Sequence, residues 1–290
     1  MKANISSEVD SIPEIISFFG LSAPLTIYPI GDGVANHNYA VRTVQGEFVV
    51  KFLVAQSVES IENDIAIQKQ LNEAGISTPE YLQSEQDMYI FNAHNLIAVV
   101  SQKIDGVIPR EVNIKLANDF GRKLATFHEN VVQLPHPNKK GLMNPAVSGI
   151  NSSIFSLSLP KGIIHGDFHL GNVLVDQVSQ DQIVAVLDFE EAGENLFVVD
   201  LAVTVMGVCS STDGYAVDID LIQKVIKGYN STRNLSDLEK THFTEAVRYS
   251  AETWIKWFKE NNYEKYAEKH KKRLESFTEL VSMQSLFIIN

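Results

Sequence analysis

Short apolar runs separated by polar turns characterise the first hundred residues, and longer runs with a helical period follow them. Residues 38–41, 47–53 and 96–101 are rich in β-branched and aromatic side chains, which favours strands. Residues 57–74 repeat apolar side chains at helical spacing before Gly75. The sequence therefore predicts a small sheet with one helix, with mostly helical structure later in the chain.

Helix signals recur towards both ends of the chain. Ser11 and Glu14 form a capping-box pattern around Pro13, which predicts a helix that begins there and ends at Gly20. Residues 113–129 predict a further helix, and buried helices are expected over 201–208 and 222–229. A second capping box, at Ser236 and Glu239, begins a helical tail. Residues 256–273 mix seven Lys and Arg with Glu, which favours a solvated helix face.

Residues 163–200 carry three polar groups at fixed spacing inside apolar runs. The runs at 163–164, 173–175 and 183–187 predict short buried strands. Gly166 and Gly171 interrupt the segment 165–172, which predicts a loop. Asp167 lies in that loop, Asn172 follows five residues later, and Asp188 follows after sixteen more at the end of a strand.

These residue types suit phosphoryl transfer. One carboxylate can accept the proton of an attacking hydroxyl group, while a carboxamide and a second carboxylate supply oxygen ligands to Mg²⁺. The alternative is that Asp, Asn and Gly only cap strands and turns, where all three are common. The joint spacing favours the catalytic interpretation, but Asp200 alone could equally be a residue that braces the loop.

Composition narrows the class of protein. The 290 residues carry a net charge of −12, which argues against nucleic acid or an anionic membrane as a partner. Cys209 is the only cysteine, so no intrachain disulfide forms. The first residues lack a long apolar stretch, and no run is long enough for a membrane span. We therefore expect a cytoplasmic protein.

The segment His165-Gly-Asp167-Phe-His169-Leu-Gly-Asn172 resembles the catalytic loop of the aminoglycoside phosphotransferase and choline kinase group. The motifs Asp188-Phe-Glu-Glu-Ala-Gly and Asp200-Leu-Ala resemble the metal-binding segment and a downstream Asp of that group. The resemblance implies that Asp167 is the catalytic base, that Asn172 and Asp188 bind Mg²⁺, and that ATP is the phosphoryl donor.

Within that group the chain most resembles the type II homoserine kinase-like proteins, through residues 33–39 and 228–248. The resemblance implies an α+β, bilobal protein-kinase-like fold. Residues 1–105 would form a small N-terminal nucleotide-binding lobe, with an antiparallel β-sheet, a helix and a hinge near 101–105. Residues 106–290 would form a larger, mostly helical lobe that carries the catalytic and substrate-binding groups.

The resemblance also assigns nucleotide contacts to the first lobe. Gly31, Gly33 and Asn36 form a hairpin tip that resembles a glycine-rich loop, although Asn36 stands where a third Gly is expected. Lys51 lies in an apolar strand, where an unpaired ammonium group is costly to bury, and the resemblance assigns it to the ATP phosphates.

Three further positions complete this assignment. The acid that orients Lys51 is either Glu62 or Asp64, with Asp64 favoured by its spacing. The adenine is expected on the linker between Ser101 and Lys103. His128, at the end of the helix over 113–129, is expected to be structural.

The acceptor is predicted to be the hydroxyl group of a small, amine-bearing molecule, with a homoserine-like amino alcohol or amino acid favoured. An amino acid needs a cation for its carboxylate, and Arg248 is the candidate. An alternative is an aminoglycoside-type antibiotic, a polycation that would need acids near the acceptor: Glu190, Glu191, Glu194 and Asp213. A second alternative is a nucleotide-binding pseudokinase.

Overall fold

Two apolar cores, each with its own secondary structure, organise the chain in the computed structural model, which describes residues 5–30, 36–54, 56–283 and 286–287. Contacts divide the chain into one unit of residues 1–61 and 79–105, and a second unit of residues 62–78 and 106–290. The predicted lobes differ from these units in residues 62–78, which group with the second unit. The roles assigned to the two lobes stay predictions.

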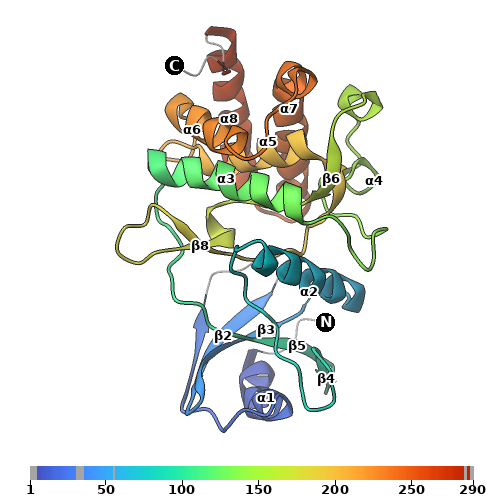
Figure 1. Cartoon of the computed structure of the whole chain (residues 1–290), viewed down its shortest axis with the longest axis vertical. Helices are drawn as coiled ribbons and strands as arrows, with labels where there is room; N and C mark the ends of the chain where they lie inside the picture. Colours follow the sequence, from blue (N-terminus) through green and yellow to red (C-terminus); the bar gives the residue numbers. More distant parts are fainter. Residues whose placement is uncertain (1–4, 31–35, 55, 284–285, 288–290) are drawn as a thin grey trace. The chain divides into compact units, whose positions relative to one another are not determined.

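The first unit is built on an antiparallel sheet of five strands in the order β1-β2-β3-β5-β4 (Figure 1). The strands are β1 (Thr26–Ile30), β2 (His37–Thr43), β3 (Gly46–Phe52), β4 (Phe91–Ala93) and β5 (Leu96–Gln102). His94 and Asn95 adopt positive φ angles at the β4–β5 turn, as a two-residue hairpin requires. The predicted strands are confirmed.

Helix α1 (Ile5–Phe18) packs against this sheet, with Ile12, Ile15 and Ile16 completely buried in its core. Glu8, also buried, contacts His37 and the hydroxyl group of Tyr39 at 2.9 and 3.2 Å, which fixes the helix to β2.

The predicted start of this helix at Ser11 is wrong. The helix already includes Ile5, the Ser11 hydroxyl donates back to the Ser7 carbonyl, and Pro13 lies inside the helix. Burial of the isoleucine face compensates for the hydrogen bond that proline cannot make.

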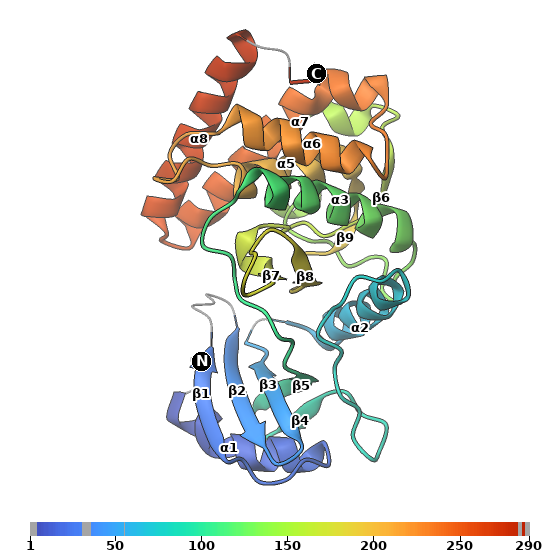
Figure 2. The ribbon, with the colours of Figure 1, turned by 60° about the vertical axis from the view of Figure 1, so that its left-hand side comes forward.

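The second unit is mostly helical, as predicted (Figure 2). Two two-stranded ribbons, β6–β9 and β7–β8, carry the catalytic segment. Its elements are the greater part of α2 (Val58–Glu73), α3 (Ile114–Asn130), α4 (Pro145–Ser148), η1 (Ser153–Ser156), β6 (Lys161–Ile164), η2 (Leu170–Asn172), β7 (Val173–Val175), β8 (Ile183–Val186), β9 (Gly193–Leu196), α5 (Phe197–Val208), α6 (Ile219–Asn230), α7 (Asp237–Glu260) and α8 (Glu264–Met283).

Helices α3 and α6 cross at nearly backbone contact because a glycine faces the other helix on each side. A Cβ atom on Gly121 would lie 1.9 Å from the Val225 carbonyl oxygen, and one on Gly228 would lie 1.9 Å from the Asn118 oxygen. This close packing places the C-terminal end of α3 beside α6, where the polar network described below forms.

The helical tail differs from its prediction in one respect. Ser236 and Glu239 form the predicted capping box at the start of α7. Residues 256–273, however, are divided between α7 and α8, and Lys269, His270 and Arg273 are half-buried rather than a solvated face. Among the described helices, none is long and apolar enough to cross a membrane.

Candidate active site

Asp167 lies in the loop between β6 and η2, where two neighbouring side chains contact one of its carboxylate oxygens. The Asn172 amide nitrogen donates to Asp167 Oδ2 at 2.9 Å and to the Asp167 carbonyl oxygen at 2.9 Å. His169 Nε2 lies 3.4 Å from the same Oδ2 atom. The three residues are half-buried, and both contacts are made to Oδ2 rather than to Oδ1 of Asp167.

His169 has a defined tautomer at this position. Its Nδ1 atom accepts a hydrogen bond of 3.0 Å from the Gly171 backbone N–H, so the proton is carried on Nε2, the atom that faces Asp167. Burial acts to lower the pKa of His169, but the negative charge of Asp167 outweighs it and the pKa is raised. His169 therefore positions the Asp167 carboxylate.

Asp200 holds the first residues of the catalytic loop through hydrogen bonds to their backbone. It is completely buried in α5, and its oxygens accept from the backbone N–H groups of His165 at 2.8 Å and Gly166 at 2.9 Å. Gly166 has a φ of +80°, and a Cβ atom there would lie 2.6 Å from the Glu191 carbonyl oxygen, so only glycine fits. Of the two roles open to Asp200, the geometry favours the brace.

The brace continues into α3 and α6. His128 Nε2 donates to Asp200 Oδ2 at 2.9 Å, and His128 Nδ1 accepts from the Tyr229 hydroxyl group at 2.7 Å. Arg233 Nη1 donates to that hydroxyl at 3.0 Å, while Arg233 Nη2 lies 2.9 Å from a Glu239 carboxylate oxygen. Each donor meets an acceptor along the chain, which we call the Asp200 brace (Asp200, His128, Tyr229, Arg233 and Glu239).

Burial and hydrogen bonding determine the charge states of His128 and Asp200. Burial lowers the pKa of His128, so its imidazole is neutral. Burial alone would raise the pKa of Asp200, but the hydrogen bond from His128 and those from the loop backbone lower it, and the carboxylate is ionised. A neutral imidazole and an ionised carboxylate agree with the donor pattern above.

Asn172 and Asp188, the predicted metal ligands, belong to adjoining segments. The Leu187 N–H donates to the Asn172 carbonyl at 2.9 Å, and His165 Nε2 lies 3.1 Å from the Leu187 carbonyl. Asp188 has a φ of +57°, an uncommon conformation for a non-glycine residue. Because the Asn172 nitrogen is bonded to Asp167, its side-chain oxygen remains for a cation, and oxygen is the ligand atom that Mg²⁺ prefers.

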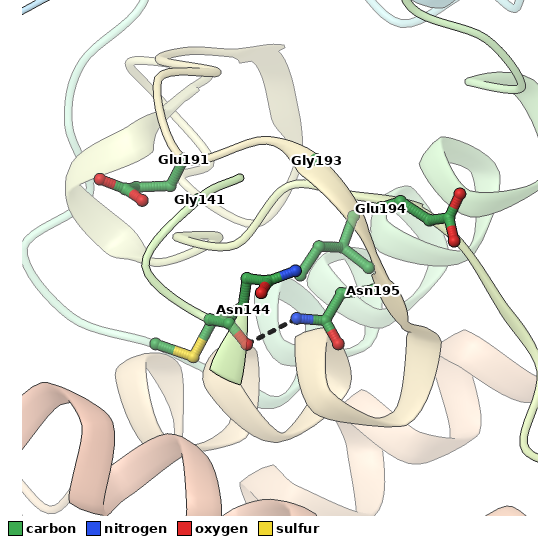
Figure 3. Close-up of a pocket in the computed structure, with 8 residues that line it drawn as sticks. Gly141, Asn144, Glu191, Gly193, Glu194 and Asn195 are labelled. Atoms are coloured by element: carbon green, nitrogen blue, oxygen red, sulfur yellow. Dashed lines mark hydrogen bonds between the residues drawn. The ribbon is translucent and has the colours of Figure 1, made fainter. Parts of the chain in front are cut away.

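The acids predicted to attract a polycation are largely engaged with other groups of the protein, and two of them, Glu191 and Glu194, are drawn in Figure 3. The Glu191 carboxylate accepts from the Leu142 N–H, and Glu194 pairs with Lys161 at 2.7 Å on an exposed part of β9. In the same recess Asn195 donates to the Met143 carbonyl at 2.6 Å. Packing here is close, because a Cβ atom on Gly141 would lie 1.9 Å from the Glu191 carbonyl oxygen.

Of the other two acids, Asp213 has an engaged carboxylate, whereas the contact described for Glu190 is made by its backbone. Asp213 accepts from the Ser211 hydroxyl at 2.6 Å and from the Tyr215 N–H at 2.9 Å. The Glu190 carbonyl accepts from the Lys139 ammonium group. Of the four predicted acids, Glu191, Glu194 and Asp213 therefore have carboxylates that are engaged within the protein.

The predicted nucleotide residues of the first unit are only partly described. Gly31 and Gly33 lie outside the described residues. Asn36 is buried, and its side-chain oxygen accepts from the Val54 N–H at 3.3 Å, so it holds the two ends of the β2–β3 hairpin together. Lys51 is half-buried in β3, opposite Asn38 and Val99 in the sheet.

The two acids considered as partners of Lys51 differ in environment. Glu62 is exposed and pairs with His136, whereas Asp64 is buried, 1% exposed, on the opposite face of α2. This burial is consistent with a structural or a catalytic role, and the pairing of Lys51 with Asp64 stays a prediction.

The linker residues take part in the sheet. Ser101 is buried and lies opposite Val49 in the β3–β5 ladder. The Lys103 ammonium group pairs with Glu47 at 3.1 Å, and the Lys103 N–H donates to the Glu47 carbonyl at 2.9 Å. The ammonium group and the backbone N–H of Lys103 therefore both have partners inside the first unit.

Two groups of polar residues have no clear sequence signal. Tyr229 lies in a segment whose apolar period predicts only a buried helix, and Arg233 lies just beyond the end of α6, where the sequence predicts no element. Arg273 lies among exposed lysines, and its partners are backbone carbonyls, which no residue type marks.

Known proteins that are similar to this chain include homoserine kinases. A homoserine kinase of Janthinobacterium sp. (strain Marseille) is 24% identical over 269 residues, which cover 84% of this chain and 83% of the relative. A homoserine kinase of Pseudomonas aeruginosa (strain LESB58) is 24% identical over 243 residues, covering 76% of each chain.

Solved structures show the same fold at low identity. An amicoumacin kinase superposes with a TM-score of 0.69 at 14% identity, covering 99% of this chain and 98% of its own. A microcompartment-associated aminopropanol kinase gives a TM-score of 0.68 at 16% identity, covering 90% and 95%. The predicted α+β protein-kinase-like fold is confirmed. The model of the phosphotransferase enzyme family matches residues 26–146 and 145–233, and the chain belongs to that family as a small-molecule kinase that phosphorylates an alcohol group.

Proposed function

We propose that the protein transfers the γ-phosphoryl group of ATP to the hydroxyl group of a homoserine-like amino alcohol or amino acid. One observation carries the proposal: a half-buried carboxylate, Asp167, is oriented by Asn172 and His169 on a loop that Asp200 holds by two backbone hydrogen bonds. A pre-organised base of this kind is what phosphoryl transfer needs from a protein.

The acceptor's hydroxyl group is proposed to donate to Asp167 Oδ1 while Oδ2 keeps its contacts with Asn172 and His169. Asp167 takes the hydroxyl proton as the new O–P bond forms. The Asp200 brace keeps the loop in place, so little reorganisation is needed during the reaction.

Asn172, through its side-chain oxygen, and Asp188 are the proposed ligands of Mg²⁺. When bound, the ion would neutralise charge on the phosphate oxygens. Lys51 is the proposed partner of the α- and β-phosphates, with Asp64 as the acid that orients it. Gly31, Gly33 and Asn36 would cover the phosphates, and the backbone near Ser101 and Lys103 would meet the adenine. The amicoumacin kinase was solved with AMP-PNP and Ca²⁺, which supports nucleotide binding as a property of this fold.

The homoserine kinase relatives and the engaged acids support a small amino-alcohol acceptor. A polycationic aminoglycoside would need several carboxylates near Asp167, but Glu194 is paired with Lys161, and Glu191 and Asp213 accept hydrogen bonds from the protein backbone. The cytoplasm is the proposed compartment.

The test is ADP formation with ATP and Mg²⁺ against homoserine, choline, hydroxylysine, methylthioribose and several aminoglycosides, with Asp167→Asn as the inactive reference. We expect turnover that depends on homoserine or a close amino alcohol and that is lost in Asp167→Asn. Turnover on aminoglycosides alone would replace the proposed acceptor. Nucleotide binding without turnover on any of these compounds would contradict the proposal and favour the pseudokinase.

A further inference from the structure

Arg273, on α8, carries a positive charge that no carboxylate of the described residues pairs with. Its Nε atom donates to the Gly214 carbonyl at 2.7 Å, and its Nη1 atom donates to the Met206 carbonyl at 3.0 Å. None of the ion pairs found among the described residues includes Arg273, and burial lowers its pKa. A half-buried guanidinium group whose partners are only carbonyl oxygens keeps its full positive charge and can attract an anion.

His270, one helical turn before Arg273, has a nitrogen atom without a partner. Its Nδ1 atom is buried and makes no hydrogen bond in the described structure, although buried polar atoms nearly always do so. Its ring packs against Phe258 with centroids 5.1 Å apart. Burial, followed by the positive charges of Arg273 and His169, lowers the pKa of His270 to about 3, so the imidazole is neutral and can donate one N–H.

Lys269 brings a second cation to the same place. A Cβ atom on Gly214 would lie 3.2 Å from both Arg273 Nη2 and Lys269 Nζ, so both cations meet at a residue without a side chain. Gly214 has a φ of +77°, which also favours glycine. The neighbouring acid, Asp213, is bonded to Ser211 and to the backbone of Tyr215, and these bonds together with the charge of Lys269 lower its pKa.

These three residues of α8 lie next to the catalytic loop. Arg273 holds the carbonyl of Met206, the residue before Gly207 in α5. A Cβ atom on Gly207 would lie 2.8 Å from His169 Cβ, and His169 in turn contacts Asp167. Helix α8 packs beside α7 and α5, and both views show it there (Figures 1 and 2).

We propose that Lys269, His270 and Arg273, the α8 cationic cluster, bind the carboxylate of an amino-acid acceptor whose hydroxyl group meets Asp167. This inference rests on the proposed kinase function and deepens it by assigning the carboxylate subsite. Arg273 Nη2 and His270 Nδ1 would donate hydrogen bonds to the carboxylate, and Lys269 would add a point charge.

Arg248, the cation expected from the sequence to bind this carboxylate, is exposed on α7 and differs from Arg273 in this respect. An exposed arginine needs no ligand to balance its charge, because water solvates it. If Arg273 binds the carboxylate, its replacement should weaken binding of the amino acid. If Arg248 binds it, replacement of Arg248 should do so instead.

The test compares L-homoserine with 3-aminopropan-1-ol, which has the same amino and hydroxyl groups but no carboxylate. For the wild type we expect a higher kcat/KM with homoserine. Arg273→Gln should raise the KM for homoserine roughly 10- to 100-fold, the usual weight of a hydrogen bond to a charged group, and leave kinetics with 3-aminopropan-1-ol nearly unchanged. Lys269→Gln should act in the same direction with a smaller effect, Arg273→Lys should restore part of the preference, and Lys271→Gln, on the exposed side of α8, is the matched control.

Three outcomes would overturn the inference. One is an equal loss with both acceptors in Arg273→Gln and Lys269→Gln, which would indicate a structural role. Another is a wild type that does not prefer the acceptor with a carboxylate, and the third is loss of the preference in Arg248→Gln instead. If Arg273→Gln does not fold, as judged by circular dichroism, Lys269→Gln and the wild-type comparison decide. Absence of turnover with either compound would overturn the proposed function, and this inference with it.

Discussion

The Asp200 brace and the α8 cationic cluster both adjoin the catalytic loop, but they differ in how their polar groups are satisfied. In the brace, Asp200, His128 and Tyr229 all have protein partners and are buried. In the cluster, Arg273 lacks an ionic partner and His270 Nδ1 lacks any hydrogen bond in the described chain. The protein itself supplies the partners of Asp200, His128 and Tyr229, whereas the cluster keeps polar groups without a partner in the described chain, and it is there that we propose a ligand.

The largest expected effect is a loss of catalytic rate on replacing Asp167, which lies in the loop that the Asp200 brace holds. Asp167→Asn should lower kcat by about 10²- to 10⁴-fold, because the amide cannot take the hydroxyl proton. The free energy of unfolding should change little, since Asp167 is partly exposed. Steady-state kinetics and urea unfolding measure the two quantities, with Asp10→Asn on α1 as the control. A loss of stability as large as the loss of rate would show that Asp167 is part of the brace instead.

Asp200→Asn should mainly destabilise the protein. The carboxylate accepts three hydrogen bonds, and an amide would turn its NH₂ group towards one of those donors. Breaking a buried charged network costs about 3–5 kcal/mol, so we expect a loss of that order in the free energy of unfolding, together with slower catalysis. Urea unfolding followed by circular dichroism is the measurement. A change below about 1 kcal/mol would contradict the brace.

Tyr229→Phe tests the middle of the same network. The substitution keeps the ring but removes the hydroxyl group between His128 and Arg233, which leaves a buried nitrogen without its donor. The expected loss is about 1–3 kcal/mol. The control Tyr28→Phe, at a half-exposed position on β1, should change the free energy of unfolding by less than about 0.5 kcal/mol. Equal effects in the two variants would mean that the Tyr229 hydroxyl group contributes nothing specific.

The smallest effect is a pH dependence that both regions share. His128 and His270 have pKa values lowered in the folded state, so below about pH 6.5 the unfolded chain binds protons that the folded chain does not. Their stabilisation is complete above that pH and is lost as the pH falls, by about 1.4 kcal/mol per pH unit for each group. The raised pKa of His169 acts in the opposite direction, because its stabilisation is present at low pH and lost as the pH rises.

Replacing one of these histidines should therefore flatten the profile. His270→Asn should lose less stability between pH 7 and pH 5.5 than the wild type, by one group's share. Urea unfolding at the two pH values measures the difference. An unchanged slope would mean that His270 is already protonated or solvated in the folded protein.

The parts of the fold that follow local rules could be predicted from the sequence. The catalytic loop is one, because Gly166, Gly171 and the short apolar runs around them define a turn between strands. The capping box of Ser236 and Glu239 is another, since both partners lie within one helical turn. The same rule failed at Ser11, where residues before the motif continue the helix and burial of the isoleucine face offsets the cost of Pro13.

Contacts between distant residues were not predictable in the same way. Asp200 could be suspected as a brace, but its link to Tyr229 through His128 depends on the close crossing of α3 and α6 at Gly121 and Gly228. The position of Arg273 could not be predicted for a different reason. A charged helix segment is usually solvated, and contacts to backbone carbonyls do not depend on residue type, so the sequence carries no sign of them. The residues of the catalytic loop could therefore be identified from the sequence, whereas Arg273, the residue that we propose for the acceptor's carboxylate, could not.

The donor chain from Arg233 through Tyr229 and His128 to Asp200 has a consequence for spectroscopy. The Tyr229 hydroxyl proton and the His128 Nε2 proton are both buried in hydrogen bonds of 2.7 and 2.9 Å. Protons in such places exchange slowly with water and resonate far downfield of the amide region. Their resonances would report the position of the catalytic loop through its bonds to Asp200, so that loop movement during turnover could be followed in the unlabelled protein without any probe in the site itself.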